Sequence, residues 1–284
     1  FSSRCCQHNH AQGWPYFTEH LVLATPDNGV ATAIYAACKA TVKVGDGKEI
    51  TLHEETNYPF EEGIAFTVST DEKVAFPFYL RIPSWTQKVE VRVNGKKVSA
   101  APVAGKYLCI NREWANGDRV ELTLPMSLSM RTWQVNKNSV SVDYGPLTLS
   151  LKIAEKYVEK DSRETAIGDS KWQKGADSKK WPTTEIYPDS PWNYSLVLDK
   201  KEPLKNFKVI RKSWPADNYP FTVASVPLEV KAIGRPVPEW KIDETGLCGV
   251  LPEEDAVKGD KEEITLIPMG AARLRISAFP NTKE

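Results

Sequence analysis

Two adjacent cysteines near the start of the sequence, Cys5 and Cys6, form the arrangement that most directly suggests chemistry. A disulfide between neighbours strains the intervening peptide, so a vicinal pair favours two thiols or two metal ligands. Zinc takes cysteine sulfur readily, usually in a four-coordinate shell. Metal binding deprotonates a thiol, and a thiolate held at a helix start can also act as a nucleophile. The pair therefore predicts a zinc-thiolate site, with two semi-buried thiols and no metal as the alternative.

Two cysteines do not complete a zinc shell, so further ligands are required. His8 and His10 follow closely and would give a local Cys2His2 cluster, although this spacing is more compact than that of zinc fingers. Alternatively, the remaining ligands precede Phe1. The residues themselves leave both arrangements open.

Two acidic pairs, Glu54-Glu55 and Glu61-Glu62, resemble the acid and base of a glycosidase. Side chains of neighbouring residues on a strand point to opposite faces of the sheet. We therefore interpret both pairs as solvated or rim residues.

The three remaining cysteines carry no predicted chemistry. The total of 5 is odd, which is not typical of a disulfide framework. Cys38 and Cys109 lie in apolar, strand-like runs and are expected to be buried free thiols. Cys248 lies in a glycine-rich stretch and has no functional interpretation.

One short helix is expected to position the cysteine segment. Pro15 suits a first helical position, and Phe17, Leu21 and Ala24 then fall on one helical face. The turn residues 26–29, Pro-Asp-Asn-Gly, are expected to end this helix.

Beyond Gly29 the hydrophobic period becomes alternating, and short apolar runs recur with turn residues between them. That pattern is typical of an antiparallel sandwich and not of parallel βαβ units. The expected strands lie at 30–44, 49–54, 64–68, 76–82, 89–93, 107–110 and 120–124, then at 140–142, 147–149, 194–198, 207–210, 222–226, 228–232, 264–267 and 274–276. We therefore predict an all-β chain of two antiparallel β-sandwich domains, residues 26–130 and 131–284, behind a short helical segment.

A polar stretch at about 155–191 interrupts the second block of strands. It is rich in Lys, Asp and Ser, with Trp172 and Trp181 dispersed in it. We interpret it as a long surface excursion partly ordered by its tryptophans; the alternative is a flexible linker.

Composition excludes several classes of partner. Lys and Arg equal Asp and Glu, 37 against 37, which gives no electrostatic footprint for nucleic acid or an anionic membrane surface. No apolar run is long enough to span a bilayer. Nine Trp residues could include a sugar-stacking platform, although most are expected in the core or at a domain interface.

A set of short motifs runs in order over nearly the whole chain. They are Cys5-Cys6-Gln7-His8-Asn9, Thr56-Asn57-Tyr58-Pro59-Phe60, Leu80-Arg81-Ile82-Pro83-Ser84-Trp85, Val93-Asn94-Gly95, Arg112-Glu113-Trp114 with Gly117-Asp118, Leu124-Pro125-Met126, Tyr144-Gly145-Pro146-Leu147 and, more loosely, Pro191-Trp192-Asn193-Tyr194, Val237-Pro238-Glu239-Trp240 and Leu266-Ile267-Pro268. The motifs are specific as a set, and through them the chain resembles the C-terminal portion of glycoside hydrolase family 127 and its relatives.

The resemblance implies a large N-terminal (α/α)6 barrel followed by two β-sandwich domains. Residues 1–25 would then be the terminal segment of a barrel that is otherwise missing, and the chain would be the back part of a larger enzyme. The resemblance also suggests a secreted or periplasmic protein.

The same resemblance implies retaining β-L-arabinofuranosidase chemistry in carbohydrate degradation. In it Cys5 is the nucleophile and a Zn²⁺ ligand, and Cys6 is a second zinc ligand. The further ligands and the acid/base glutamate would lie upstream, so the isolated chain is expected to be inactive. The expected substrate is a plant-type glycan or an arabinose-containing oligosaccharide. Gln7-His8 replaces the prolines of better-known members, which leaves the exact sugar open. The alternative function is a non-catalytic module that binds carbohydrate or braces the barrel.

Overall fold

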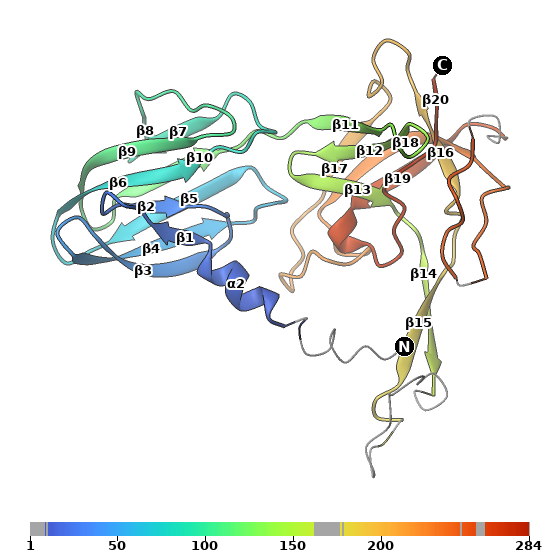
Figure 1. Cartoon of the computed structure of the whole chain (residues 1–284), viewed down its shortest axis with the longest axis horizontal. Coiled ribbons are helices and arrows are strands. Elements are labelled where there is room, and N and C mark those ends of the chain that lie inside the picture. Colours follow the sequence, from blue (N-terminus) through green and yellow to red (C-terminus); the bar gives the residue numbers. More distant parts are fainter. Residues whose placement is uncertain are drawn as a thin grey trace. The chain divides into compact units, whose positions relative to one another are not determined.

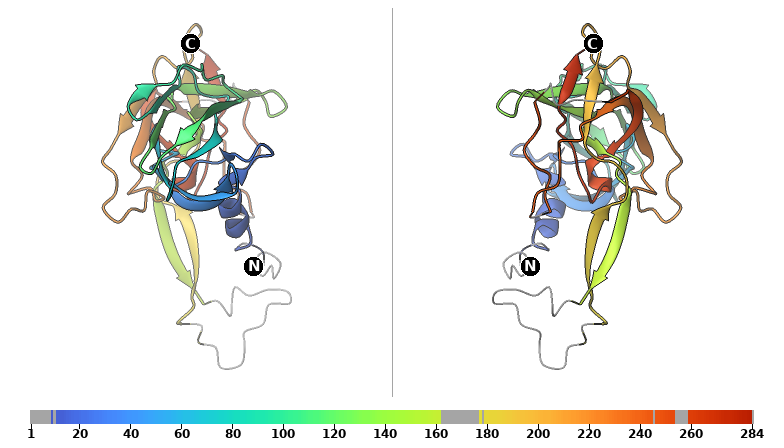
Figure 2. Two further views of the ribbon diagram at one scale, coloured as in Figure 1. Left: turned by 90° about the vertical axis from the view of Figure 1, so that its left-hand side faces the viewer. Right: turned by 90° about the vertical axis from the view of Figure 1, so that its right-hand side faces the viewer.

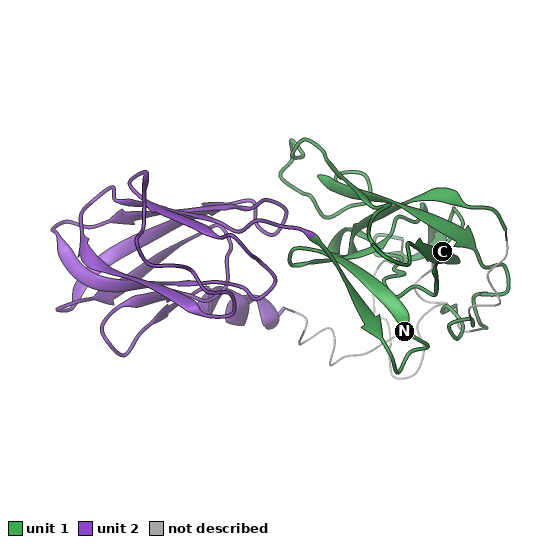
Figure 3. Cartoon of the chain, turned by 90° about the horizontal axis from the view of Figure 1, so that it is seen from above, with its two compact units in different colours: residues 1–2, 128–284 green, residues 3–127 purple. Residues whose placement is uncertain are grey.

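A computed structural model of the chain describes residues 9, 11–161, 177, 179–244, 246–253 and 259–283. Nearly all regular structure in these residues is β-strand, so the predicted all-β class is confirmed (Figure 1). The chain divides into two compact units, residues 3–127 and residues 128–284 (Figure 3). The predicted boundary at residue 130 and the assignment of residues 1–25 to a barrel remain predictions.

The first unit contains two sheets whose inner faces share one hydrophobic core. Alternation of apolar and polar residues along each strand produces this arrangement, because successive side chains point to opposite faces. The four-stranded sheet has the order β1-β2-β6-β9, and the six-stranded sheet has the order β3-β4-β5-β10-β7-β8. Their strands are β1 Val22–Ala24, β2 Val30–Thr32, β6 Val74–Arg81, β9 Tyr107–Trp114, β3 Cys38–Val44, β4 Lys48–Thr56, β5 Gly63–Ser69, β10 Arg119–Thr123, β7 Glu90–Val93 and β8 Lys96–Lys97.

Trp114 anchors this core at the end of β9. Its side chain is fully buried, stacks on Phe76 at a centroid distance of 5.7 Å and meets Phe78 edge-on at 6.0 Å. Its indole N–H donates to the carbonyl of Phe76 at 3.0 Å, so the one polar atom of the ring is satisfied. Aromatic contacts of this kind give the sandwich a rigid centre.

The second unit contains one eight-stranded sheet, of order β11-β12-β13-β19-β18-β16-β20, with β17 also paired to β18. Backbone hydrogen bonds join Val140 in β12 to Phe279, just before β20, in both directions. The sheet therefore curls until its far end contacts β12, which encloses an apolar interior. Its strands are β11 Leu128–Trp133, β12 Ser139–Tyr144, β13 Leu147–Leu151, β19 Glu262–Pro268, β18 Leu228–Pro236, β16 Tyr194–Leu198, β20 Asn281–Lys283 and β17 Lys208–Arg211; the 3-10 helix η2 Met269–Ala271 follows β19.

Two strands stand apart from this sheet. β14 (Glu155–Lys160) and β15 (Thr183–Pro188) pair only with each other and extend away from the rest of their unit (Figures 1 and 2). They are the ends of the polar stretch predicted as a surface excursion; Trp172, between them, lies outside the described residues. Trp181 is 65% exposed, and the Lys180 ammonium lies 5.9 Å from the centroid of its ring.

The helix prediction was too long. Helix α2 spans Gly13–Glu19 and buries none of its residues. The predicted last turn is instead β1, because Val22 to Ala24 pair with Thr32 to Val30 of β2. The turn at Pro26 to Gly29 therefore closes a hairpin. Tertiary pairing has overridden the helical pattern here.

Four further expectations were wrong. Residues 222–226 form a turn in which the Val226 N–H donates to the Thr222 carbonyl, and residues 274–276 lie outside any strand. Cys109 is an exposed free thiol, because on β9 it alternates with the buried Leu108 and faces solvent. Cys38 is a free thiol of intermediate burial.

Candidate functional site

The predicted zinc-thiolate pair cannot be placed in the fold. Cys5, Cys6, His8 and His10 lie outside the described residues. Within the part of the chain that the structure describes, no group of three or more His, Cys, Asp or Glu side chains is arranged to hold a metal ion. No helix in that same part is long and apolar enough to cross a membrane.

The acidic pair Glu54-Glu55 divides between the two faces of the six-stranded sheet, as its positions on β4 predicted. The expectation that both glutamates are solvated or rim residues was wrong for Glu54, because its face of the sheet packs into the core. Glu54 points into the sandwich and is only 1% exposed, whereas Glu55 faces solvent. Burial raises the pKa of the Glu54 carboxyl to about 8, against hydrogen bonds from the Ala36 N–H and the Cys38 thiol that favour the charged form. Glu54 is therefore largely protonated at neutral pH.

Few polar groups surround this buried carboxyl. Its Oε2 lies 3.9 Å from the Sγ of Cys38, while Oε1 has no partner among the described residues. Burial and the neighbouring carboxyl group raise the pKa of the Cys38 thiol to about 11, so this cysteine is a poor nucleophile. The pair Cys38 and Glu54 is thus a neutral, partly buried contact and does not resemble an activated thiol.

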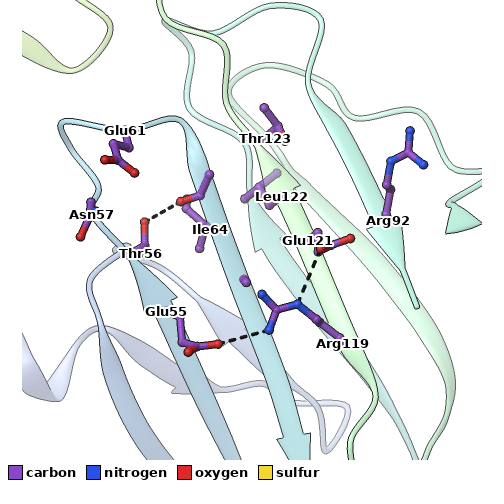
Figure 4. Close-up of a pocket in the computed structure, with 12 residues that line it drawn as sticks. Glu55, Thr56, Asn57, Glu61, Ile64, Arg92, Arg119, Glu121, Leu122 and Thr123 are labelled. Carbon is purple, nitrogen blue, oxygen red and sulfur yellow. Dashed lines mark hydrogen bonds and ion pairs between the residues drawn. The ribbon is translucent and has the colours of Figure 1, made fainter. Parts of the chain in front are cut away.

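The solvent face of the same sheet carries an open groove of about 610 Å³ (Figure 4). One row of side chains crosses it on four strands: Glu55 of β4 lies opposite Ala65 of β5, then Glu121 of β10 and Arg92 of β7. The smallest of these residues, Ala65, forms the floor together with Gly63. A volume of this size is within the range of small-molecule sites.

An ion-pair network fixes the long side chains of this groove. Arg119 reaches across β5 so that its Nη1 lies 3.2 Å from Glu55 Oε2, and its Nε lies 3.6 Å from Glu121 Oε1 (Figure 4). The three side chains are about half exposed, so each pair contributes little to stability. Their effect is to hold carboxylate acceptors and guanidinium donors in a set order along the groove.

Thr56, Asn57 and Glu61 close the groove at the end of β4. The Thr56 hydroxyl donates to the Gly63 carbonyl at 2.7 Å and accepts the Tyr58 N–H at 2.9 Å. This bridge holds the chain between β4 and β5 against the groove. The second acidic pair again divides, because Glu61 lines the groove while Glu62 accepts the Met126 N–H at 3.0 Å.

The sequence motifs mainly build the first sandwich. Asn94 donates from its amide nitrogen to Asp118 at 2.7 Å, and its amide oxygen accepts the Arg119 N–H at 2.8 Å. The other oxygen of Asp118 accepts the Ala115 N–H. These hydrogen bonds join the turn at residues 94–95 to the turn at residues 116–118. These motif residues therefore have structural roles.

The groove was missed in the sequence because strands distant in the chain assemble it. β10 lies between β5 and β7, and no spacing in the sequence predicts this strand order. The available signal was the alternation of Arg119, Glu121 and Thr123 with buried Val120 and Leu122, which identifies an outward polar face.

Most of the first unit matches a domain of a known protein family. Residues 29–126 match the family model described as the middle domain of the GH127 β-L-arabinofuranosidases. The resemblance to glycoside hydrolase family 127 is thereby confirmed. Among curated proteins, none matches the chain.

Three solved structures have the fold of this chain over 99% of its length. One is Ara127N-Se, a GH127 β-L-arabinofuranosidase from Geobacillus stearothermophilus T6, with 22% identity, 38% of its own length covered and a TM-score of 0.65. A second, described as a glycoside hydrolase, has 22% identity, 40% covered and a TM-score of 0.66. The third is the GH127 β-arabinofuranosidase BT3674, with 23% identity, 39% covered and a TM-score of 0.64. The chain thus spans well under half the length of each.

Proposed function

We propose that this chain supplies the two β-sandwich domains and the nucleophile segment of a glycoside hydrolase that acts on β-L-arabinofuranosides. The observation that carries the proposal is the match of residues 29–126 to the GH127 middle domain. The shared fold over 99% of the chain extends the same interpretation to the second unit. The balanced charge agrees with a neutral glycan as substrate.

Cys5 and Cys6 are the residues assigned to the chemistry. Two thiols form a donor set that suits Zn²⁺, so both residues would serve as ligands. When bound, zinc would keep the thiols deprotonated at neutral pH. Cys5 would then act as the nucleophile toward the anomeric carbon. In this proposal the sandwiches position the cysteine segment, and the proton donor for the leaving group comes from elsewhere.

The acid/base group is assigned to a part of the enzyme other than these two units. A retaining glycosidase places an acid/base carboxyl group and a nucleophile on either side of the scissile glycosidic bond. These two groups lie about 5–5.5 Å apart. Glu54 and Glu55 lie on opposite faces of a sheet, and Glu62 is engaged with the backbone of Met126. We therefore expect no hydrolysis from the 284-residue chain alone.

Two measurements on the purified chain test the assignment. The chain alone should release no product from an aryl β-L-arabinofuranoside. Release above the uncatalysed rate would overturn the assignment of the acid/base group to another part of the enzyme. Metal analysis after dialysis against zinc should give less than one tightly held zinc per chain. Stoichiometric zinc that is lost in a His8→Ala, His10→Ala variant would favour the local Cys2His2 cluster instead.

A further inference from the structure

We propose that the groove on the solvent face of the six-stranded sheet binds a short neutral saccharide. This inference does not depend on the function assigned to Cys5. It follows from the shape of the groove, from the order of charges along it and from the rigidity of the strands that form it.

The shape leaves room for a ligand directly over the sheet. Gly63 and Ala65 are the outward-facing residues of β5 at the floor. A Cβ built on Gly63 would meet no other atom within 4 Å, so the space above this residue is open. Longer side chains on the flanking strands, Glu55 on one side and Glu121 on the other, stand above this floor as walls. The result is a trough flanked by Glu55 and Glu121, with the Arg119 side chain lying across β5 between them (Figure 4).

The charges select a neutral, hydroxyl-rich ligand. Three carboxylates, of Glu55, Glu61 and Glu121, oppose an anion, and two guanidinium groups, of Arg92 and Arg119, oppose a cation. A sugar hydroxyl both donates and accepts, so neighbouring hydroxyls can meet a carboxylate and a guanidinium at once.

Arg119 is the central donor of the proposed site. Glu55 and Glu121 engage its Nη1 and Nε, and the planar guanidinium carries further N–H groups that remain for a ligand. Because both carboxylates hold the guanidinium across β5, little side-chain entropy is lost when it binds a sugar. The strands beneath are paired on both sides, so the floor is preorganised.

No Trp, Tyr or Phe lines the groove among the described residues, so stacking does not contribute to the predicted binding. Recognition rests on hydrogen bonds that compete with water, and each of these has a modest net value. We therefore expect weak affinity, which makes an NMR titration of the purified chain the suitable measurement.

The test titrates the 284-residue chain with a neutral arabino-oligosaccharide, and separately with an acidic oligogalacturonide and a cationic chitosan oligomer. The neutral sugar should shift the amide resonances of Gly63, Ala65 and Glu121 in a saturable way. Ala65→Leu fills the floor without removing a polar group, and it should weaken binding at least tenfold. Arg119→Gln removes the central donor and should have a similar effect.

Lys39→Gln provides the matched control. Lys39 is exposed on the neighbouring strand β3 and does not line the groove, so its loss should leave binding unchanged. Unshifted resonances at Gly63 and Ala65 with the neutral arabino-oligosaccharide would overturn the proposal. Binding that survives Ala65→Leu, or stronger binding of either charged oligomer, would overturn it as well. None of these outcomes bears on hydrolysis at Cys5.

Discussion

Replacement of the buried Glu54 by Gln should change how the stability of the first unit depends on pH. The carboxyl is 1% exposed, and burial raises its pKa from 4.5 to about 8. Between these two pH values the native state binds more protons than the unfolded state. The free energy of unfolding therefore falls as pH rises through this window. A glutamine side chain at this position would occupy nearly the same volume and has no proton to lose.

The size of the effect follows from the two pKa values. Linkage gives a loss of about 3 kcal/mol in the wild type between pH 5 and pH 7.5, attributable to Glu54 alone. Glu54→Gln should escape this loss. The free energy of unfolding of the variant, minus that of the wild type, should therefore rise by this amount between pH 5 and pH 7.5. With a slope of about 2 kcal/mol per M, the urea midpoint would shift by about 1.5 M.

Urea unfolding at pH 5 and pH 7.5 provides the assay, followed through the NMR resonance of the Trp114 indole N–H, which is buried in the same unit. Glu55→Gln is the control, since this neighbouring glutamate faces solvent and should alter the change in unfolding free energy between pH 5 and pH 7.5 by less than about 0.5 kcal/mol. Equal pH dependence in wild type and Glu54→Gln would refute the argument that Glu54 is neutral because of its burial.

Further predictions concern the core, the thiols and a buried ion pair. Trp114→Leu removes the ring stacked on Phe76 together with its hydrogen bond and should cost about 3–4 kcal/mol in urea unfolding. Cys109 is exposed, whereas Cys38 is partly buried with a raised pKa, so mass spectrometry after brief alkylation at pH 8 should find Cys109 modified before Cys38. Burial opposes ionisation of Glu229, yet hydrogen bonds from Lys152 and Lys212 lower the pKa of its carboxyl overall. The free energy of unfolding of the second unit should therefore fall as the pH drops below the ordinary pKa of Glu. Glu229→Gln should remove this pH dependence, which urea unfolding at several acidic pH values would measure.

The strand pattern of this chain was readable because one face of each sheet is buried. Along β5, Ile64, Phe66 and Val68 alternate with small or polar residues, and this period of two predicts a half-buried strand. Turn residues such as Asn94-Gly95, with Asn94 and Gly95 both at positive φ, marked the ends of strands correctly.

Errors arose where both faces of a segment look alike in the sequence. In the run 107–110 all four residues, Tyr-Leu-Cys-Ile, are apolar, so alternation could not show that Cys109 faces solvent. The segment 22–24 suited a helix locally, and only its pairing with β2 makes it a strand. Likewise, the groove depends on β10 lying between β5 and β7, a long-range pairing that local pattern does not encode.

The most direct test of the central proposal uses the protein that contains this sequence, purified as its host organism makes it. The measurement is the hydrolysis of an aryl β-L-arabinofuranoside. We expect hydrolysis with retention of anomeric configuration, and we expect Cys5→Ser to abolish it. Cys109→Ser, at the exposed thiol on β9, should leave the rate unchanged. Undiminished hydrolysis in the Cys5→Ser protein, or no hydrolysis by the wild type, would contradict the assignment.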